Sequence, residues 1–283
     1  MKKKIGLVLE GGAMRGLFSA GVMDVFMEHG IIFDGIVGVS AGAAFGCNYK
    51  SMQPGRAIRY NKRFAKDPRY CGLRSLLKSG DIFNAHFAYH VVPVEYDKFD
   101  EQAYESNPVD FHVVCTDVLT GKPVYKVLPK ADYDTYEWIR ASASMPVVSK
   151  VVKLDGYHLL DGGISDSIPL KYFEEQGYDR CVVILTQPLD YVKHKSRMLP
   201  LLRWRLRRYP QFVEAFARRP EMYNAQTAYV RQREAEGSAL VIRPDAPLQI
   251  GHIEHDACRM QSVYDIGRRK GEQMIEQVKG FVG

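Results

Sequence analysis

The chain has 283 residues, of which 46% are hydrophobic and 25% charged, and its formal net charge is +6. This composition is typical of a folded globular protein and excludes a disordered chain. No stretch approaches the roughly 20 apolar residues of a transmembrane helix, and the apolar run Ile5–Leu9 after the basic start is too short for a signal peptide.

The cysteines are odd in number, widely spaced and without a C-x-x-C pair. This usage is typical of reduced thiols in the cytoplasm and argues against a structural metal site. The sequence therefore predicts a cytoplasmic protein that needs no metal and no other cofactor. The five cysteines are Cys47, Cys71, Cys115, Cys181 and Cys258.

The first elements follow a strand–helix–strand order. Lys4–Leu9 is an apolar strand that leads into a glycine-rich turn. Apolar residues then recur at helical spacing over Phe18–His29, and Gly30 stands where a helix C-terminus favours glycine. Ile31–Val39 is predicted as the second strand. A βαβ unit of this kind requires a sheet that is at least partly parallel.

Later elements are less regular, and residues 52–105 give no clear order of elements. Strands are expected at 111–115, 124–127, 148–154, 156–160 and 180–185, the first two as an antiparallel pair around the turn Thr120-Gly121. A helix is expected at 133–141, and an exposed terminal helix at 258–278. Pro200, Pro210 and Pro220 each suit the first turn of a short helix.

The second strand ends in the pattern G-x-S-x-G, with Ser40 between Gly38 and Gly42. This pattern is typical of a nucleophile elbow, in which a serine hydroxyl is exposed at a sharp strand-to-helix turn. The early position of Ser40 excludes an α/β-hydrolase, because each parallel crossover needs about a dozen residues or more. Ser40 is therefore a candidate nucleophile in a different α/β architecture.

The glycine-rich turn after the first strand offers hydrogen-bond donors for an oxyanion. Backbone amides of Gly11, Gly12 and Ala13 open a helix, whose N-terminus attracts negative charge. If the first two strands are adjacent and parallel, this turn lies beside Ser40. The alternative is a nucleotide-binding loop, but G-x-G-x-x-G would need glycine at position 13, and no G-K-[ST] is present.

A base for the serine is harder to identify. Asp161 is the best candidate because it ends a strand and precedes two glycines, which allow close approach of another loop. Such an aspartate more often only forms a turn. His252 and His255, in a late loop, could instead complete a Ser-Asp-His set.

Together these segments resemble the patatin-like phospholipase family, which combines a glycine-rich turn, G-x-S-x-G and a late D-G-[GA]. Here the three read Glu10–Gly16, Gly38–Gly42 and Asp161–Gly163. Thr116-Asp117 and the block Ala141–Pro146 are similar to further blocks of the family. The resemblance covers roughly residues 5–170 and is much weaker beyond about residue 190.

The resemblance implies a three-layer α/β/α fold with a mostly parallel central sheet and a Ser40–Asp161 dyad without histidine. Asp161 would take the proton of Ser40 as it attacks an ester, and the turn amides would hold the oxyanion, with Arg15 shaping that loop. The family usually has glycine at the position of Ala13. If φ is positive there, alanine costs on the order of 1 kcal/mol.

The segment 193–219 carries nine lysine or arginine side chains and one acid, and apolar residues recur among them. A basic amphipathic segment with an aromatic residue suits an anionic lipid surface, here the inner face of the membrane. The alternative is a helical cap that packs its apolar side on the core. Nucleic-acid binding is not expected, because no reader motif accompanies the charge.

The sequence thus predicts a catalytic domain over residues 1–190 and a basic helical extension over 191–283 that packs on it. The expected activity is hydrolysis of lipid acyl esters through an acyl-enzyme. Two alternatives remain: a non-catalytic protein that binds an acyl group or an anion, and a Ser-Asp-His esterase. The oligomeric state is not predicted.

Overall fold

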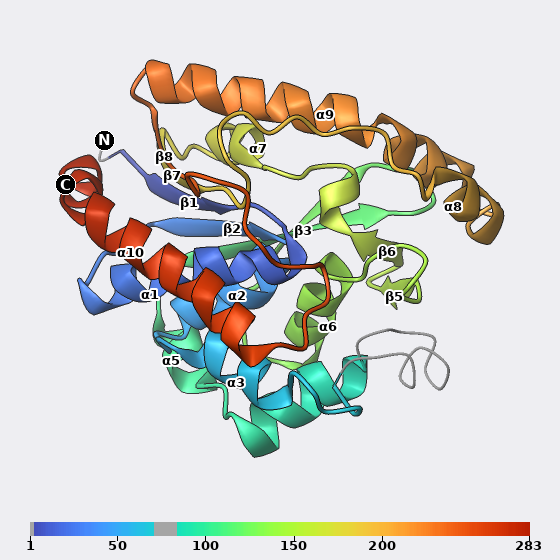
Figure 1. Ribbon diagram of the computed structural model, residues 1–283, viewed down its shortest axis with the longest axis horizontal. Coiled ribbons are helices and arrows are strands. Elements are labelled where there is room, and N and C mark those ends of the chain that lie inside the picture. Colours follow the sequence, from blue (N-terminus) through green and yellow to red (C-terminus); the bar gives the residue numbers. More distant parts are fainter. Residues whose placement is uncertain (1–2, 71–83) are drawn as a thin grey trace.

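The computed structural model describes residues 3–70 and 84–283. Its centre is an eight-stranded sheet in the order β5-β6-β3-β2-β1-β7-β8, with β4 paired to β3 (Figure 1). The strands are β1 (Ile5–Leu9), β2 (Gly35–Val39), β3 (Asp110–Asp117), β4 (Pro123–Val127), β5 (Val152–Leu154), β6 (Tyr157–Asp161), β7 (Arg180–Ile184) and β8 (Ala239–Ile242).

The sheet is mixed, with parallel pairing through its middle. Strands β8, β7, β1, β2 and β3 run parallel to one another, whereas β4 and β6 pair antiparallel with β3, and β5 with β6. The parallel strands are buried on both faces, as helical crossovers require. Both the mostly parallel sheet and the antiparallel pair β3–β4 confirm the sequence-based expectation.

Helices cover both faces, so the fold has three layers (Figure 1). Leu7 and Leu9 of β1 face one helical layer and Val8 faces the other, because successive strand residues point to opposite sides. The first layer contains α1 (Gly16–Glu28), α2 (Ala41–Lys50), α3 (Arg56–Phe64), α5 (Glu101–Ser106), α6 (Tyr133–Ser142) and α10 (Ala257–Val282). The second contains α7 (Leu170–Glu175) and α9 (Pro210–Ala235), and α8 (Leu199–Arg205) packs on α9.

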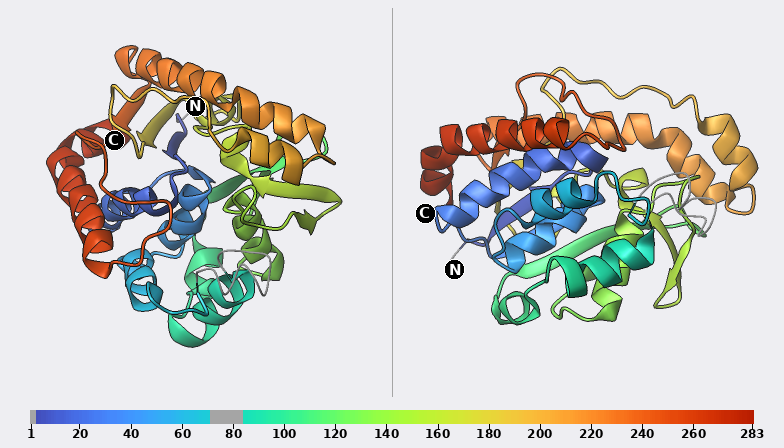
Figure 2. Two further views of the ribbon diagram at one scale, coloured as in Figure 1. Left: turned by 45° about the vertical axis from the view of Figure 1, so that its right-hand side comes forward. Right: turned by 60° about the horizontal axis from the view of Figure 1, so that its bottom comes forward.

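The terminal helix α10 lies along α1 (Figure 2), and the two backbones approach closely. A Cβ on Gly267 would lie 2.0 Å from the carbonyl oxygen of Phe18, and one on Gly21 would lie 2.2 Å from that of Tyr264. The predicted exposed terminal helix is therefore wrong in part. One face of α10 is buried, because glycines on both helices allow this contact.

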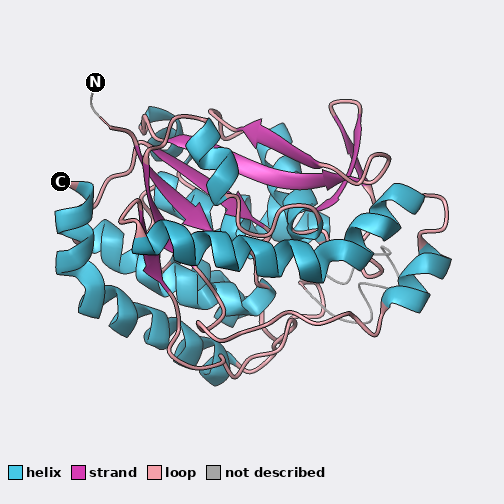
Figure 3. Cartoon of the chain, turned by 90° about the horizontal axis from the view of Figure 1, so that it is seen from above, coloured by secondary structure: helices cyan, strands magenta, loops and turns pink. Residues whose placement is uncertain are grey.

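The proline pattern also needs a correction. Pro200 and Pro210 begin α8 and α9 as expected, but Pro220 lies inside α9, which continues across the strands for 26 residues (Figure 3). A helix-interior proline loses one backbone hydrogen bond. Here burial of Pro220 itself, together with Phe212 and Tyr223 on the same helix, offsets that loss.

One further expectation changes in detail. Strand β2 is shorter than 31–39, because residues 31–34 form the connection in which the Asp34 carboxylate accepts a hydrogen bond from the amide of Ile5 at 2.7 Å. Cys47, Cys115, Cys181 and Cys258 are unpaired, and Cys71 lies outside the described residues. Within the described ranges, no helix has both the length and the apolar character needed to cross a bilayer.

Candidate active site

Ser40 stands at the turn between β2 and α2. Its backbone angles are φ 55° and ψ −119°, a strained conformation that residues other than glycine rarely adopt. The flanking glycines make the turn sterically possible: a Cβ on Gly38 would lie 2.5 Å from the carbonyl oxygen of Gly42, and one on Gly42 would lie 2.5 Å from that of Leu9. The elbow expected from G-x-S-x-G is present.

Asp161 ends β6 and meets Ser40 beside β3. The Ser40 hydroxyl donates to Asp161 Oδ2 at 2.7 Å, and the Gly163 amide donates to Asp161 Oδ1 at 2.8 Å. The register explains the meeting, because Val39 pairs with Val114 of β3 and the next residue, Cys115, pairs with Asp161. Two residues 121 positions apart in sequence are thus brought into direct contact.

Two hydroxyl groups and one backbone carbonyl hold the pair in place. The Ser142 hydroxyl accepts a hydrogen bond from the Ser40 amide at 2.9 Å and donates to a carbonyl of β3. The Asp161 amide donates to the Ser144 carbonyl at 2.9 Å, and the Thr116 hydroxyl donates to the Asp161 carbonyl at 2.8 Å. Both ends of the serine–aspartate contact are therefore held by the sheet and by the end of α6.

The electrostatics of Asp161 suit a base. Burial raises the pKa of its carboxyl above the usual value, because the charged form loses hydration. The positive charge of Arg219, the hydrogen bonds from Ser40 and Gly163, and the charge of Lys193 all act in the opposite direction. The result is a carboxylate that is poised to accept a proton but still has partners for its charged form.

The glycine-rich turn lies against the elbow. A Cβ on Gly11 would lie 2.9 Å from Cβ of Ser40, so only glycine allows this approach. The turn continues through Gly12 into a short 3₁₀ helix, Ala13–Arg15. Ala13 has φ 48°, the left-handed region, so alanine here carries a strain on the order of 1 kcal/mol.

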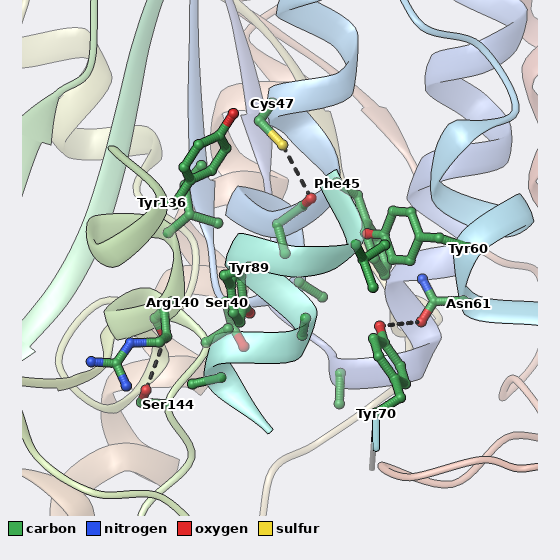
Figure 4. Close-up of a pocket in the computed structure, with 18 of the residues that line it drawn as sticks. Ser40, Phe45, Cys47, Tyr60, Asn61, Tyr70, Tyr89, Tyr136, Arg140 and Ser144 are labelled. Atoms are coloured by element: carbon green, nitrogen blue, oxygen red, sulfur yellow. Dashed lines mark hydrogen bonds between the residues drawn. The ribbon is translucent and has the colours of Figure 1, made fainter. Parts of the chain in front are cut away.

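A cavity of about 130 Å³ opens beside Ser40 (Figure 4). Its walls come from α2, α3, α6 and the π-helix η2 (Phe87–Tyr96), and they are mostly apolar and aromatic. The cavity also touches Ala13 of the glycine-rich turn, so the hydroxyl and the turn face one space. Representative wall residues are Phe45, Tyr60, Tyr89, Phe99, Tyr136 and Ile139.

Comparison with models of known protein families identifies the family of this chain. Residues 7–174 match the model of the patatin-like phospholipase family. The chain belongs to this family. Residues 209–283 match a second model, a domain of unknown function designated DUF6363.

Relatives of this patatin-like chain include longer proteins. It is 33% identical to the uncharacterized protein YjjU of Escherichia coli over 65% of this chain and 52% of that protein. It is 25% identical to lysophospholipase nte1 of Aspergillus terreus over 98% of this chain and 18% of that protein. The chain therefore spans about half the length, or less, of these curated relatives.

A solved structure supports the fold assignment. The crystal structure of VipD from Legionella pneumophila matches with a TM-score of 0.50 and 12% identity, over 98% of this chain and 67% of that one. At this identity the likeness concerns the fold alone. It confirms the patatin-like three-layer architecture with its C-terminal helical region.

The two histidines considered for a triad behave differently in this patatin-like site. His252 lines the cavity beside Ser40, whereas His255 Nδ1 lies 2.6 Å from the carbonyl oxygen of Ala65. Neither hydrogen-bonds to Ser40 or Asp161 within the described residues. In the same ranges, no group of three or more His, Cys, Asp or Glu side chains is arranged to hold a metal ion.

Sequence reasoning missed several residues of the site. Ser142 and Ser144 lie in a block whose only signal in the sequence is its resemblance to the family, although both contact the pair directly. In the sequence Lys193 and Arg219 are two of the many cations of the basic segment, yet both act electrostatically on Asp161. No local signal marks them, because tertiary packing brings them to the site: α9 carries Arg219, and Asn224 of α9 hydrogen-bonds to the backbone of Lys193.

Proposed function

We propose that the protein is a serine acyl hydrolase that cleaves carboxylic esters of lipids through a Ser40–Asp161 dyad. The observation that carries the proposal is the 2.7 Å hydrogen bond between these side chains at a strained elbow that faces an apolar cavity. Membership of the patatin-like phospholipase family supports hydrolysis of lipid esters in general.

In the proposed first step, Ser40 Oγ attacks the ester carbonyl carbon while Asp161 Oδ2 accepts the hydroxyl proton. The developing oxyanion is stabilised by amides of the turn at Gly11, Gly12 and Ala13. The C–O bond of the ester then breaks, and the leaving alcohol takes the proton from Asp161. An acyl-serine remains.

In the second step, Asp161 accepts a proton from water, whose oxygen attacks the acyl-serine. The serine oxygen leaves and regains its proton, which releases the fatty acid and restores the dyad. Direct contact between the two side chains supports a mechanism without histidine, because no third group is needed to move the proton.

Labelling tests this proposal. A fluorophosphonate probe is expected to form a covalent adduct on Ser40 of the wild type, because the activated hydroxyl is the nucleophile. Adduct formation and hydrolysis of a lysophospholipid should both be lost in Ser40→Ala and retained in Ser106→Ala, which removes an exposed hydroxyl from α5. A folded wild type without adduct or turnover would favour the acyl-binding alternative. Loss of activity on substitution of His252 would favour the triad.

We further propose that the surface around α8 contacts an anionic lipid surface. Leu202 and Leu206 belong to the same buried apolar cluster as Leu160, the residue before Asp161, which supports in part the alternative of a helical cap. Leu201 and Trp204, by contrast, are 48% and 66% exposed and lie among exposed arginines. An apolar and basic surface at the edge that bears the site suits a substrate presented in a bilayer.

Trp204→Ser is expected to weaken binding to phosphatidylglycerol vesicles by about tenfold, because a large aromatic side chain no longer enters the interface. Co-sedimentation with the vesicles measures this partitioning. The matched control is Ile32→Ser, which removes another strongly exposed apolar side chain (73%). Ile32 precedes β2, whereas Ser40 follows the other end of that strand. Equal binding of both variants and the wild type would contradict the proposed contact.

A further inference from the structure

Three cations converge beside the dyad from three separate segments. Arg15 belongs to the glycine-rich turn, Lys193 to the connection after β7, and Arg219 to α9. All three are half-buried, and none forms an ion pair with a carboxylate in the described part of the chain. Moreover, the Nε atoms of Arg15 and Arg219 are buried without any hydrogen-bond partner, which is rare for charged donors.

Electrostatic effects show that the three charges lie close together. Burial and the charges of Arg219 and Arg15 lower the pKa of Lys193 to about 8, although Glu10 and Asp161 oppose this effect. His252 responds to the same cations: burial lowers its pKa, and Arg15, Lys193 and Arg219 lower it further. The cluster is therefore an excess of positive charge near His252, which lines the cavity.

The nearby carboxylates already have other partners. Glu10 accepts hydrogen bonds from the Tyr223 hydroxyl at 2.7 Å and from the backbone and side chain of Thr186. Asp161 accepts from Ser40 and from Gly163. Neither carboxylate therefore neutralises the cluster. The Lys193 ammonium lies 4.4 Å from the ring centre of Tyr223, and the Nε atoms of Arg15 and Arg219 have no protein acceptor in the described ranges.

The placement of the cluster relative to the cavity indicates what it binds. The apolar cavity lies on the side of α2, α3 and α6, whereas α9 brings Arg219 from the opposite layer. A Cβ on Gly163 would lie 3.2 Å from Arg219 Nη2 and 3.1 Å from Asp161 Oδ1, so the guanidinium and the dyad are neighbours. An ester bound at Ser40, with its acyl chain in the cavity, would direct its alcohol part toward the cations. Guanidinium and ammonium groups bind phosphate well.

We propose that Lys193 and Arg219, together with Arg15, form a binding site for the phosphate of an anionic acyl ester. The inference rests on the proposed hydrolase function and names the residues that would bind the phosphate of its substrate. It also gives a role to the region 209–283 of unknown function, which supplies Arg219 to the site. Residues outside the patatin match would thereby set the headgroup preference.

The test compares two substrates that differ only in the phosphate, oleoyl lysophosphatidic acid and monooleoylglycerol. The wild type should prefer the phosphate-bearing ester in kcat/KM. Lys193→Gln and Arg219→Gln should each reduce this preference about tenfold or more, as loss of one charge-assisted contact predicts. Arg219→Lys should keep part of it. Using the ratio of the two substrates on one enzyme cancels any effect of Arg219 on the ionisation of Asp161.

Matched controls are Lys195→Gln and Arg218→Gln, which remove exposed charges from the same segments and should leave the ratio unchanged. An unchanged ratio in Lys193→Gln and Arg219→Gln would overturn the proposal. Inorganic phosphate could inhibit the wild type but not Arg219→Gln, while the ratio of the two substrates is the same in both proteins. That result would assign the site to free phosphate and reject a lipid headgroup. If the wild type hydrolyses neither ester, the proposed function fails. Equilibrium dialysis of glycerol phosphate against the wild type and Arg219→Gln then tests the anion site alone.

Discussion

Replacement of Asp161 by asparagine is expected to lower kcat for ester hydrolysis about a thousand- to ten-thousandfold, because the variant keeps the shape of the site but loses the proposed base. An asparagine amide can still bond to Ser40 and to the Gly163 amide, so the elbow should remain in place. Steady-state hydrolysis of a neutral acyl ester and the rate of fluorophosphonate labelling measure the loss.

The control for this prediction is Asp166→Asn. Asp166 is also a buried aspartate with a pKa raised by burial, but it bonds to Tyr125 and Gln226 and lies outside the dyad. Its amide variant should keep nearly full kcat. A similar loss of kcat in both variants would mean that the buried aspartates of this region are needed for the fold. It would refute the proposal that Asp161 acts as a specific base.

Asp161→Asn should also stabilise the fold at neutral pH. A carboxyl whose pKa is raised by burial favours folding in its protonated form. That contribution is complete below the unfolded pKa and is lost as the pH rises through the higher folded pKa. Asparagine is neutral at every pH, so the Tm of Asp161→Asn should exceed that of the wild type at neutral pH and approach it in acid. Opposite changes in activity and Tm are the pattern of a residue kept for function.

Much of this site could be predicted because its parts are local motifs at strand ends. Ser40 and the turn at Gly11 each follow a parallel strand, and parallel neighbours bring their carboxyl ends to the same edge. The sign of φ at Ala13 could not be read from the sequence, since it depends on how the turn fits against the elbow. Asp161 was also ambiguous, because an Asp-Gly pair usually forms only a turn.

The residues between 52 and 105 resisted prediction for a physical reason. Helix η2 is a π-helix that contains Pro93, so its apolar residues do not repeat at the spacing of an ordinary α-helix. Several of them line the cavity and do not fill a continuous core face. The place of Arg219 in the site could not be predicted for a different reason. It is one arginine among many in the sequence, and only the packing of α9 distinguishes it from exposed neighbours such as Arg218.

The contact between α1 and α10 leads to a second large effect, on stability. Gly267→Ala is expected to lower the free energy of unfolding by about 3 kcal/mol, because the added Cβ would meet the backbone of Phe18, which cannot move aside as a side chain could. Denaturant unfolding followed by circular dichroism measures the change. The matched control is Gly280→Ala on the same helix, where a Cβ would meet no atom within 4 Å. That variant should be neutral or slightly more stable.

The form of the unfolding curve tests how the C-terminal region relates to the catalytic part. We propose that residues 191–283 do not fold separately, since β8 extends the central sheet and α10 packs into the same core as α1. Gly267→Ala should then shift a single transition, and esterase activity should be lost at the same denaturant concentration as helical structure. A separate early transition that leaves activity intact would instead make this region an independent unit. Arg219 would then be carried by a part of the protein that can detach from the dyad it faces.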